Sequence, residues 1–154
     1  MNRQVLLTLT VLVLAVGCTS PGPDDTPWTG AACTLAHDSA STYGYTCDND
    51  VTVTIDRTGA SSSKNFDQSE KSARQTGMLV TGLDDVGDKA MLIADPPGKL
   101  MPATTLHGEA VSRNAILVAK MTLPAPITSE ADMTAHATEM ATLLNETLKN
   151  LQTT

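Results

Sequence analysis

The feature that most constrains this chain is a long apolar run at its N-terminus. Arg3 supplies one positive charge, the run extends almost unbroken from Val5 to Val16, and small residues lead up to Cys18. A helix needs about 20 apolar residues to span a membrane, and the prolines and aspartates after Cys18 end this run too early. The pattern is typical of an export signal, so residues 1–17 are expected to be a leader that is not part of the fold.

The residues just before Cys18 carry a more specific pattern. Leu14-Ala15-Val16-Gly17-Cys18 resembles the signal of bacterial lipoproteins, in which small residues precede a cysteine that is acylated and becomes the new N-terminus. The resemblance implies lipid attachment at Cys18 and anchoring to the extracytoplasmic face of the cell membrane. Ala15 stands where that signal usually has leucine. Ala15-x-Gly17 also suits ordinary signal peptidase cleavage, which leaves Cys18 as a free thiol.

The cysteine count fits a lipidated Cys18. The chain has three cysteines, and an exported protein with an odd number leaves one unpaired unless that residue has another fate. Lipidation of Cys18 leaves Cys33 and Cys47 as a pair, whose disulfide would close a loop of about 15 residues and stabilise the fold by roughly 3 kcal/mol. Two reduced, buried thiols are the alternative. No zinc-binding Cys/His spacing is present, so we expect no metal and no cofactor.

Length and charge limit the rest of the chain to one small domain. The 154 residues are 41% apolar, and the formal net charge is -7. Such a charge repels a phosphate backbone, so nucleic acid is not an expected partner. We expect a lipoprotein signal at residues 1–17, a Pro/Gly/Asp-rich tether at 18–30 and a single α+β domain at 31–154.

Alternating apolar and polar residues predict antiparallel strands. Tyr43, Tyr45 and Cys47 share one face, and Asp48-Asn49-Asp50 has the composition of a turn. Asn114 suits a left-handed position in the turn of a later hairpin. The expected strands are 43–47, 51–55, 78–81, 90–94, 104–112 and 115–123.

Two helices are expected beside these strands. The first covers residues 65–76 and has a thin apolar face. The second begins at a capping box, Ser129-Glu130-Ala131-Asp132, and has an apolar stripe along one side. That stripe consists of Met133, Ala137, Met140, Leu144, Leu148 and Leu151. The predicted fold is therefore α+β: a single antiparallel sheet with one inserted helix and a C-terminal amphipathic helix packed on it.

The order of these features resembles small actinobacterial lipoproteins of uncharacterised domain families. The resemblance rests on Cys33 and Cys47, the strand pair that follows, the segment 80–90, the late hairpin and the closing helix. Cys33-Thr34-Leu35 stands where such families often have Cys-Leu-Leu, and Asp48 stands where Trp often follows the second cysteine. The resemblance implies no known activity.

The segment from Gly82 to Lys89 approximates the spacing of a phosphate-binding loop. Asp88 separates Gly87 from Lys89, no Ser or Thr follows the lysine, and three carboxylates in the segment would repel a phosphate. The same carboxylates lack the EF-hand pattern of a calcium site. A solvated acidic turn is the favoured interpretation.

Three histidines suggest further chemistry. Asp132, His136 and Met140 are spaced at i, i+4 and i+8, but their ligand atoms are of mismatched softness, so a surface histidine beside the core is the simpler interpretation. His37 follows Cys33 closely, and His107 shares a strand face with Glu109. Either histidine could support acid–base chemistry with a serine, but the serines at 61–63 lack the context of a nucleophile.

These observations favour a membrane-anchored envelope lipoprotein without a catalytic set. We expect it to bind an envelope component or partner protein through one face of its sheet. An alternative is a carrier or sensor of a small apolar or lipid ligand, held between the sheet and the helix that contains Met133 and Met140. A hydrolytic enzyme is a more remote alternative, because active sites assembled from distant residues leave no local pattern.

Overall fold

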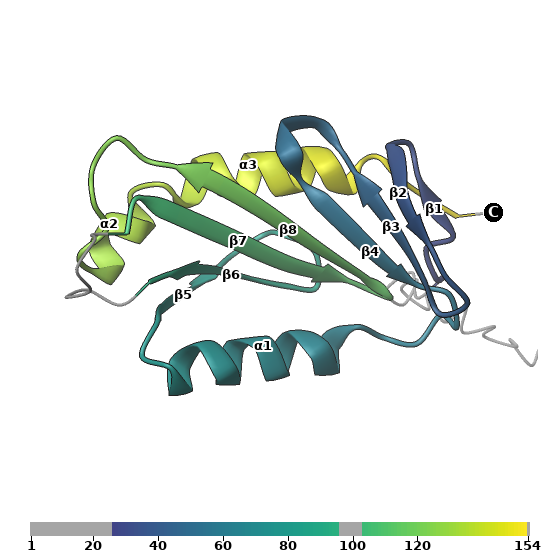
Figure 1. Cartoon of the computed structure of the whole chain (residues 1–154), viewed down its shortest axis with the longest axis horizontal. Coiled ribbons are helices and arrows are strands. Elements are labelled where there is room, and N and C mark those ends of the chain that lie inside the picture. The colour runs from purple at the N-terminus through teal and green to yellow at the C-terminus, as the bar shows by residue number, and fades with distance from the viewer. Residues whose placement is uncertain (1–25, 96–102, 154) are drawn as a thin grey trace, which may run out of the picture.

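The computed structural model describes residues 26–95 and 103–153, which form helices on the two faces of an antiparallel sheet (Figure 1). The elements follow one another as β1 (Gly30–Ala31), β2 (Thr34–Asp38), β3 (Thr42–Thr46), η1 (Asp48–Asp50), β4 (Thr52–Asp56), α1 (Ser63–Gln75), β5 (Leu79–Leu83), β6 (Lys89–Ala94), β7 (Thr105–Ser112), β8 (Ala115–Thr122), α2 (Glu130–Thr134), α3 (Ala137–Leu148) and β9 (Leu151–Gln152).

The main sheet has seven strands in the order β2-β3-β4-β8-β7-β6-β5. Strands β2 to β4 form one meander and strands β5 to β8 another. The two join where β4 pairs antiparallel with β8, with Val53 opposite Leu117. Helix α1 connects the meanders and lies against β5, β6 and β7. The mixed α/β class and the mostly antiparallel pairing are as the sequence predicts.

A second, two-stranded sheet pairs β1 with β9, which the prediction of a single sheet does not include. Ala31 lies opposite Leu151 in this pair. The backbone N–H of Thr29 donates to the Gln152 carbonyl at 2.8 Å, and that of Ala32 donates to the Asn150 carbonyl at 2.7 Å. Leu151 is therefore in a strand beyond the last helix, where it is buried.

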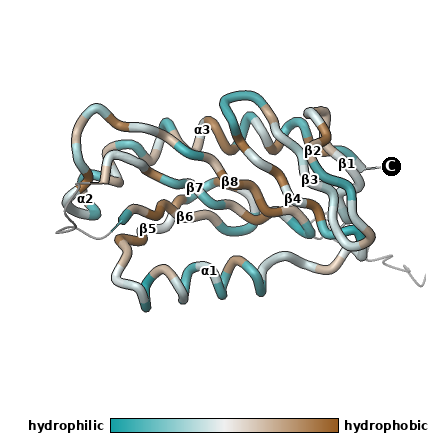
Figure 2. The backbone as a smooth tube through the Cα atoms, viewed as in Figure 1, coloured by the Kyte–Doolittle hydropathy of each residue, from teal (hydrophilic) through white to brown (hydrophobic). Residues whose placement is uncertain are grey.

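The larger core fills the space between the sheet and the helices α2 and α3. Alternate residues of the central strands point into it, including Val53, Leu92, Leu106 and Leu117, which are fully buried. Figure 2 shows the strongly apolar segments in the sheet, whereas α1 is mainly hydrophilic. The alternation accordingly directs one face of each central strand into this core.

A smaller core lies on the opposite face, beneath α1. Phe66 and Ala73 of the helix pack with Met91 and Val111 of the sheet, which confirms the thin apolar face predicted for this helix. Because α1 lies on β5, β6 and β7, the same face of the sheet continues beyond it. The threonines of β4 on that face are exposed.

The predicted C-terminal helix is divided into two. The capping box at Ser129 is present: its hydroxyl accepts from the Asp132 N–H, and the Asp132 carboxylate accepts from the Ser129 N–H. After α2 the chain forms a tighter turn, in which the His136 N–H donates to the carbonyl of Met133, three residues earlier. Met133 and Met140 are fully buried on either side of this break, so both are core residues.

The turn between β7 and β8 differs from the prediction in one residue. Arg113, and not Asn114, adopts the left-handed conformation, with φ of 55°. The Asn114 side chain is buried and forms hydrogen bonds with distant backbone groups of Trp28 and Asp56. The polar side chain is therefore used for a tertiary contact instead of a local turn.

Candidate binding groove

The structure confirms the predicted disulfide. Cys33 and Cys47 are bonded, their Cα atoms lie 4.8 Å apart, and they are 14 positions apart in sequence. The bond joins the residue before β2 to the residue after β3, next to the paired Thr34 and Thr46. Cys18, the predicted site of lipid attachment, lies outside the described residues.

The acidic segment between β5 and β6 is a tight turn. Asp85 and Gly87 have positive φ angles, and Val86 between them is buried. The Asp88 carboxylate accepts from the Arg113 backbone N–H, and Lys89 forms an ion pair with Asp67 at 2.7 Å. The lysine and one of the carboxylates of the phosphate-loop-like pattern thus have structural partners.

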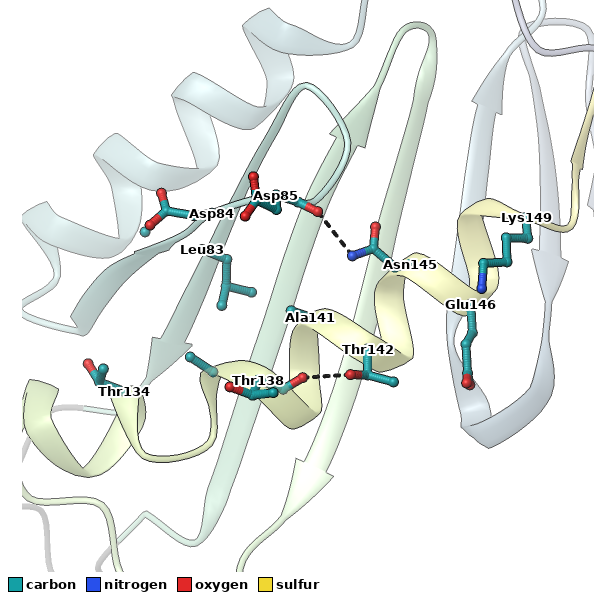
Figure 3. Close-up of a pocket in the computed structure, with 12 residues that line it drawn as sticks. Leu83, Asp84, Asp85, Thr134, Thr138, Ala141, Thr142, Asn145, Glu146 and Lys149 are labelled. Atoms are coloured by element: carbon teal, nitrogen blue, oxygen red, sulfur yellow. Dashed lines mark hydrogen bonds between the residues drawn. The ribbon is translucent and has the colours of Figure 1, made fainter.

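A polar groove of about 540 Å³ separates this turn from α3 (Figure 3). Its edges hold Asp84, Asp85, Thr138, Thr142 and Asn145. Asn145 Nδ2 donates to the Asp85 carbonyl at 3.0 Å, and the Thr142 hydroxyl donates to the Thr138 carbonyl of its own helix. The Asn145 bond ties the turn to the helix, so we interpret the groove as a structural junction.

The residues of the suggested Asp132–His136–Met140 set have separate roles. Asp132 caps α2, and hydrogen bonds from the Thr128 backbone and hydroxyl hold its carboxyl pKa below the usual value. His136 Nδ1 lies 3.8 Å from a Glu139 carboxylate oxygen, and Met140 is fully buried. Within the described ranges, no three His, Cys, Asp or Glu side chains gather as metal ligands.

A second groove, of about 520 Å³, lies between α1 and the sheet and contains the His107–Glu109 pair. Both residues point from β7 toward α1. Glu109 lies opposite Met91 on one neighbouring strand and Val118 on the other. The Ser69 hydroxyl of α1 donates to Glu109 Oε2 at 2.8 Å. The groove is lined by Ser69, Ser72, Ala73, Thr76, Met78, Ile93, His107, Glu109 and Val118.

The two titratable side chains of this groove have shifted pKa values. Partial burial raises the pKa of Glu109, and the hydrogen bond from Ser69 opposes that rise. The pKa of His107 is lowered, first by partial burial and then by the positive charge of Lys120, while Asp95 acts in the opposite direction. Both shifts favour the uncharged form of the side chain, as expected where water is partly excluded.

The groove brings the Ser69 hydroxyl to the Glu109 carboxylate, with His107 on the same strand face. The Ser69 hydroxyl donates to Glu109, and the serines at 61–63 lie at the start of α1. His37 is on the edge strand β2, paired with Gly44. Of the acid–base candidates from the sequence, His37 and the serines at 61–63 therefore lie apart from the His107–Glu109 pair.

Ser69 is the groove residue that sequence reasoning missed. It follows Phe66 by three positions and precedes Ala73 by four, so helical geometry places all three side chains on the face toward the sheet. This spacing could have indicated its orientation. Its contact with Glu109, however, depends on how α1 is positioned over β7, which no local pattern specifies.

Comparison with known proteins finds no family model that matches this chain, and neither a curated protein nor a solved structure matches it. None of the helices in the described part of the chain is long and apolar enough to cross a membrane.

Proposed function

We propose that this protein is a lipid-anchored binding module on the extracytoplasmic side of the cell membrane. The lipoprotein-like signal ending at Cys18 supports the anchor. The disulfide between Cys33 and Cys47 supports an oxidising compartment, because such bonds persist mainly outside the cytoplasm. In this proposal the protein carries out no catalytic step, and its groove between α1 and the sheet binds a partner protein of the envelope.

The position of the groove suits an anchored module. The first described residues are held at the β7–β8 turn, where the Arg113 guanidinium donates to the Thr26 carbonyl at 2.6 Å. The groove is built on the C-terminal half of α1 and the first half of β7, toward the other end of the sheet (Figure 1). A tether leading to Thr26 would therefore leave the groove accessible from the side away from the membrane.

The observation that carries the binding proposal is the half-buried carboxylate of Glu109 in a largely apolar groove. Ala73, Met78, Ile93 and Val118 supply apolar surface around it. Partial removal of a carboxylate from water costs free energy unless a partner compensates for it. Concave apolar surface with a few directed polar groups is typical of binding sites.

The anchor is tested by the intact mass of the protein purified from its native membrane, with and without thiol reduction and alkylation. We expect a chain that begins at Cys18 with added acyl groups, and two thiols that become alkylatable only after reduction. A soluble, unacylated chain with a reactive Cys18 would contradict the anchor.

The binding site is tested with a photo-crosslinking amino acid at one position of α1 in the native membrane. At Ser72, which lines the groove, the probe should give a discrete protein adduct. At the exposed Lys71, which points away from the sheet by helical geometry, it should not. Equal labelling from both positions would contradict binding in the groove. Lipid adducts from Ser72 alone would favour the carrier alternative.

A further inference from the structure

The groove contains a carboxylate with unused hydrogen-bonding capacity. A carboxylate group can accept about four hydrogen bonds. In the part of the chain that the structure describes, the side-chain hydrogen bond to Glu109 comes from the Ser69 hydroxyl. The cross-strand neighbours Met91 and Val118 have no side-chain N–H or O–H to donate. Acceptor positions on Glu109 are therefore available to a group that enters the groove.

The cations of α1 and β6 near the groove are engaged elsewhere. Arg74 of α1 forms a salt bridge with Glu70 at 2.9 Å. Lys89, at the start of β6, forms one with Asp67. No ion pair to Glu109 occurs within the residues described. A positive group from outside would thus be the complementary occupant for this carboxylate.

The other charged side chains near the groove, Lys120 and Asp95, act on His107. Lys120 of β8 is the cross-strand partner of His107, and both Lys120 and Asp95 act electrostatically on that imidazole. The two charges act on His107 in opposite directions, Lys120 more strongly, and neither is among the groups that shift the pKa of Glu109. Lys71 of α1 is exposed on the side of the helix away from the sheet. The groove beside Glu109 therefore keeps a negative character, in a chain whose net charge is -7.

The apolar surface next to Glu109 indicates that the part of the ligand beside its charged group should be apolar. Ile93 and Val118 lie on the sheet side of the groove, and Ala73 and Met78 lie at its helix side. Burial of an aliphatic chain against such a surface is favourable, because it removes apolar surface from water. The occupant should therefore combine a cationic head with an apolar stem.

We propose that the groove binds the side chain of a lysine presented by a partner protein. The ammonium group donates to the Glu109 carboxylate, and the four-carbon stem lies over Ile93 and Val118. The exposed Thr52 and Thr54 of β4 extend the same face of the sheet. The Thr52 hydroxyl donates to the Val118 carbonyl at 3.4 Å, and both hydroxyls can accept hydrogen bonds from the surface around that lysine. This inference rests on the proposed function and names the chemical class of its partner.

The proposal is tested by NMR titration of the ¹⁵N-labelled whole chain with Nα-acetyl-lysine methylamide. The amides of Ser69, Glu109 and Val118 should shift and saturate. The norleucine analogue, which lacks the amine, should bind at least tenfold more weakly. Equal binding of the two compounds would overturn the proposal, since the ammonium group would then contribute nothing.

Two charge-matched variants locate the binding site. Glu109→Gln removes the carboxylate and keeps the shape of the side chain, so it should weaken binding of the lysine compound at least tenfold. Glu146→Gln makes the same change beside the other groove, on α3, and should leave binding unchanged (Figure 3). Each variant is first checked for a wild-type pattern of dispersed amide signals. Wild-type affinity in a folded Glu109→Gln variant would overturn the proposal.

The remaining outcomes separate this inference from the function on which it rests. A protein adduct from the probe at Ser72, together with no shift from the lysine compound, would overturn the lysine proposal and leave the binding function standing. If neither the probe adduct at Ser72 nor the NMR shift with the lysine compound is observed, both the lysine proposal and the proposed binding function are overturned. Hexylamine replaces the lysine compound in a third titration, and binding of hexylamine alone would overturn the protein partner in favour of an amine-bearing lipid.

Discussion

The side-chain amide of Asn114 clamps the backbone of Trp28. Asn114 Oδ1 accepts from the Trp28 N–H at 2.7 Å, and Asn114 Nδ2 donates to the Trp28 carbonyl at 2.9 Å. The same Nδ2 donates to the Asp56 carbonyl at 2.8 Å. The Arg113 guanidinium adds a cation–π contact, 4.0 Å from the centre of a Trp28 ring. One turn thus fixes the point at which the N-terminal segment joins the domain.

We predict that Asn114→Ala lowers the free energy of unfolding by about 2–3 kcal/mol, because it leaves the half-buried N–H and carbonyl of Trp28 without these partners and removes one hydrogen bond from the Asp56 carbonyl. Urea unfolding monitored by Trp28 fluorescence measures this loss. Asn145→Ala is the control, since that amide makes an exposed hydrogen bond to the Asp85 carbonyl and should cost less than about 0.5 kcal/mol. Similar losses in both variants would contradict the clamp.

Local patterns in the sequence predict the hairpins β3–β4, β5–β6 and β7–β8 of the main sheet, but they miss the edge strand β2, whose residues are all exposed and show no apolar alternation. The strand pair β3–β4 follows from the alternation of Tyr43, Tyr45, Val53 and Ile55, because a period of two directs these side chains to one face. The acidic segment at 48–50 provides its turn, with positive φ at Asn49 and Asp50. These elements form between neighbouring parts of the chain, so a short window of sequence contains the necessary information.

Apart from β2, the features that sequence reasoning missed depend on distant contacts. Strands β1 and β9 have two residues each and pair across most of the domain, so neither shows a periodicity. The residue with positive φ in the β7–β8 turn is Arg113. The side chain of Asn114 is instead hydrogen-bonded to the backbone of Trp28. In the groove, the period of two places His107 and Glu109 on one face. Ser69, which donates a hydrogen bond to Glu109, can be identified only from the packing of α1 on the sheet.

We predict that Cys33→Ala and Cys47→Ala each lower the free energy of unfolding by about 3 kcal/mol under oxidising conditions. The disulfide closes a short loop around the β2–β3 hairpin, so its loss increases the conformational entropy of the unfolded chain. Amide hydrogen exchange should also become faster in the edge strand β2 than in β7. Equal unfolding midpoints for oxidised and reduced wild-type protein would contradict this prediction.

The close contact between β7 and α3 at Gly108 gives a further prediction. A Cβ atom at this position would lie 2.5 Å from Met140 Cγ and Sδ and 3.2 Å from Leu144 Cδ1. Gly108→Ala should therefore lower the free energy of unfolding by about 1–3 kcal/mol. Gly82→Ala is the control, because a Cβ atom there meets nothing within 4 Å, and it should be close to neutral.

A double variant shows whether Met140 is the cause. When Met140→Ala is combined with Gly108→Ala, the total loss of stability should be smaller than the sum of the two single losses, since the smaller side chain makes room for the new methyl group. Additive losses in urea unfolding would place the strain elsewhere.

The raised pKa of Glu109 predicts a specific pH dependence of stability. Because partial burial raises this pKa in the folded state, the folded protein binds more protons than the unfolded chain between the ordinary pKa of a glutamate and the raised value. The contribution of Glu109 to the free energy of unfolding is thus fully present below the ordinary pKa, and it is lost as the pH rises through the raised value.

Glu109→Gln isolates this contribution, because the neutral amide does not titrate. Relative to wild type, the variant should be more stable at pH 7 than at pH 4 when both proteins are unfolded in urea. A constant difference between the two proteins across this range would contradict the raised pKa.

The Glu109 carboxyl group also reports on the proposed ligand. An ammonium group beside it favours the charged form, so the NMR titration of Glu109 should move to lower pH when the lysine compound is bound.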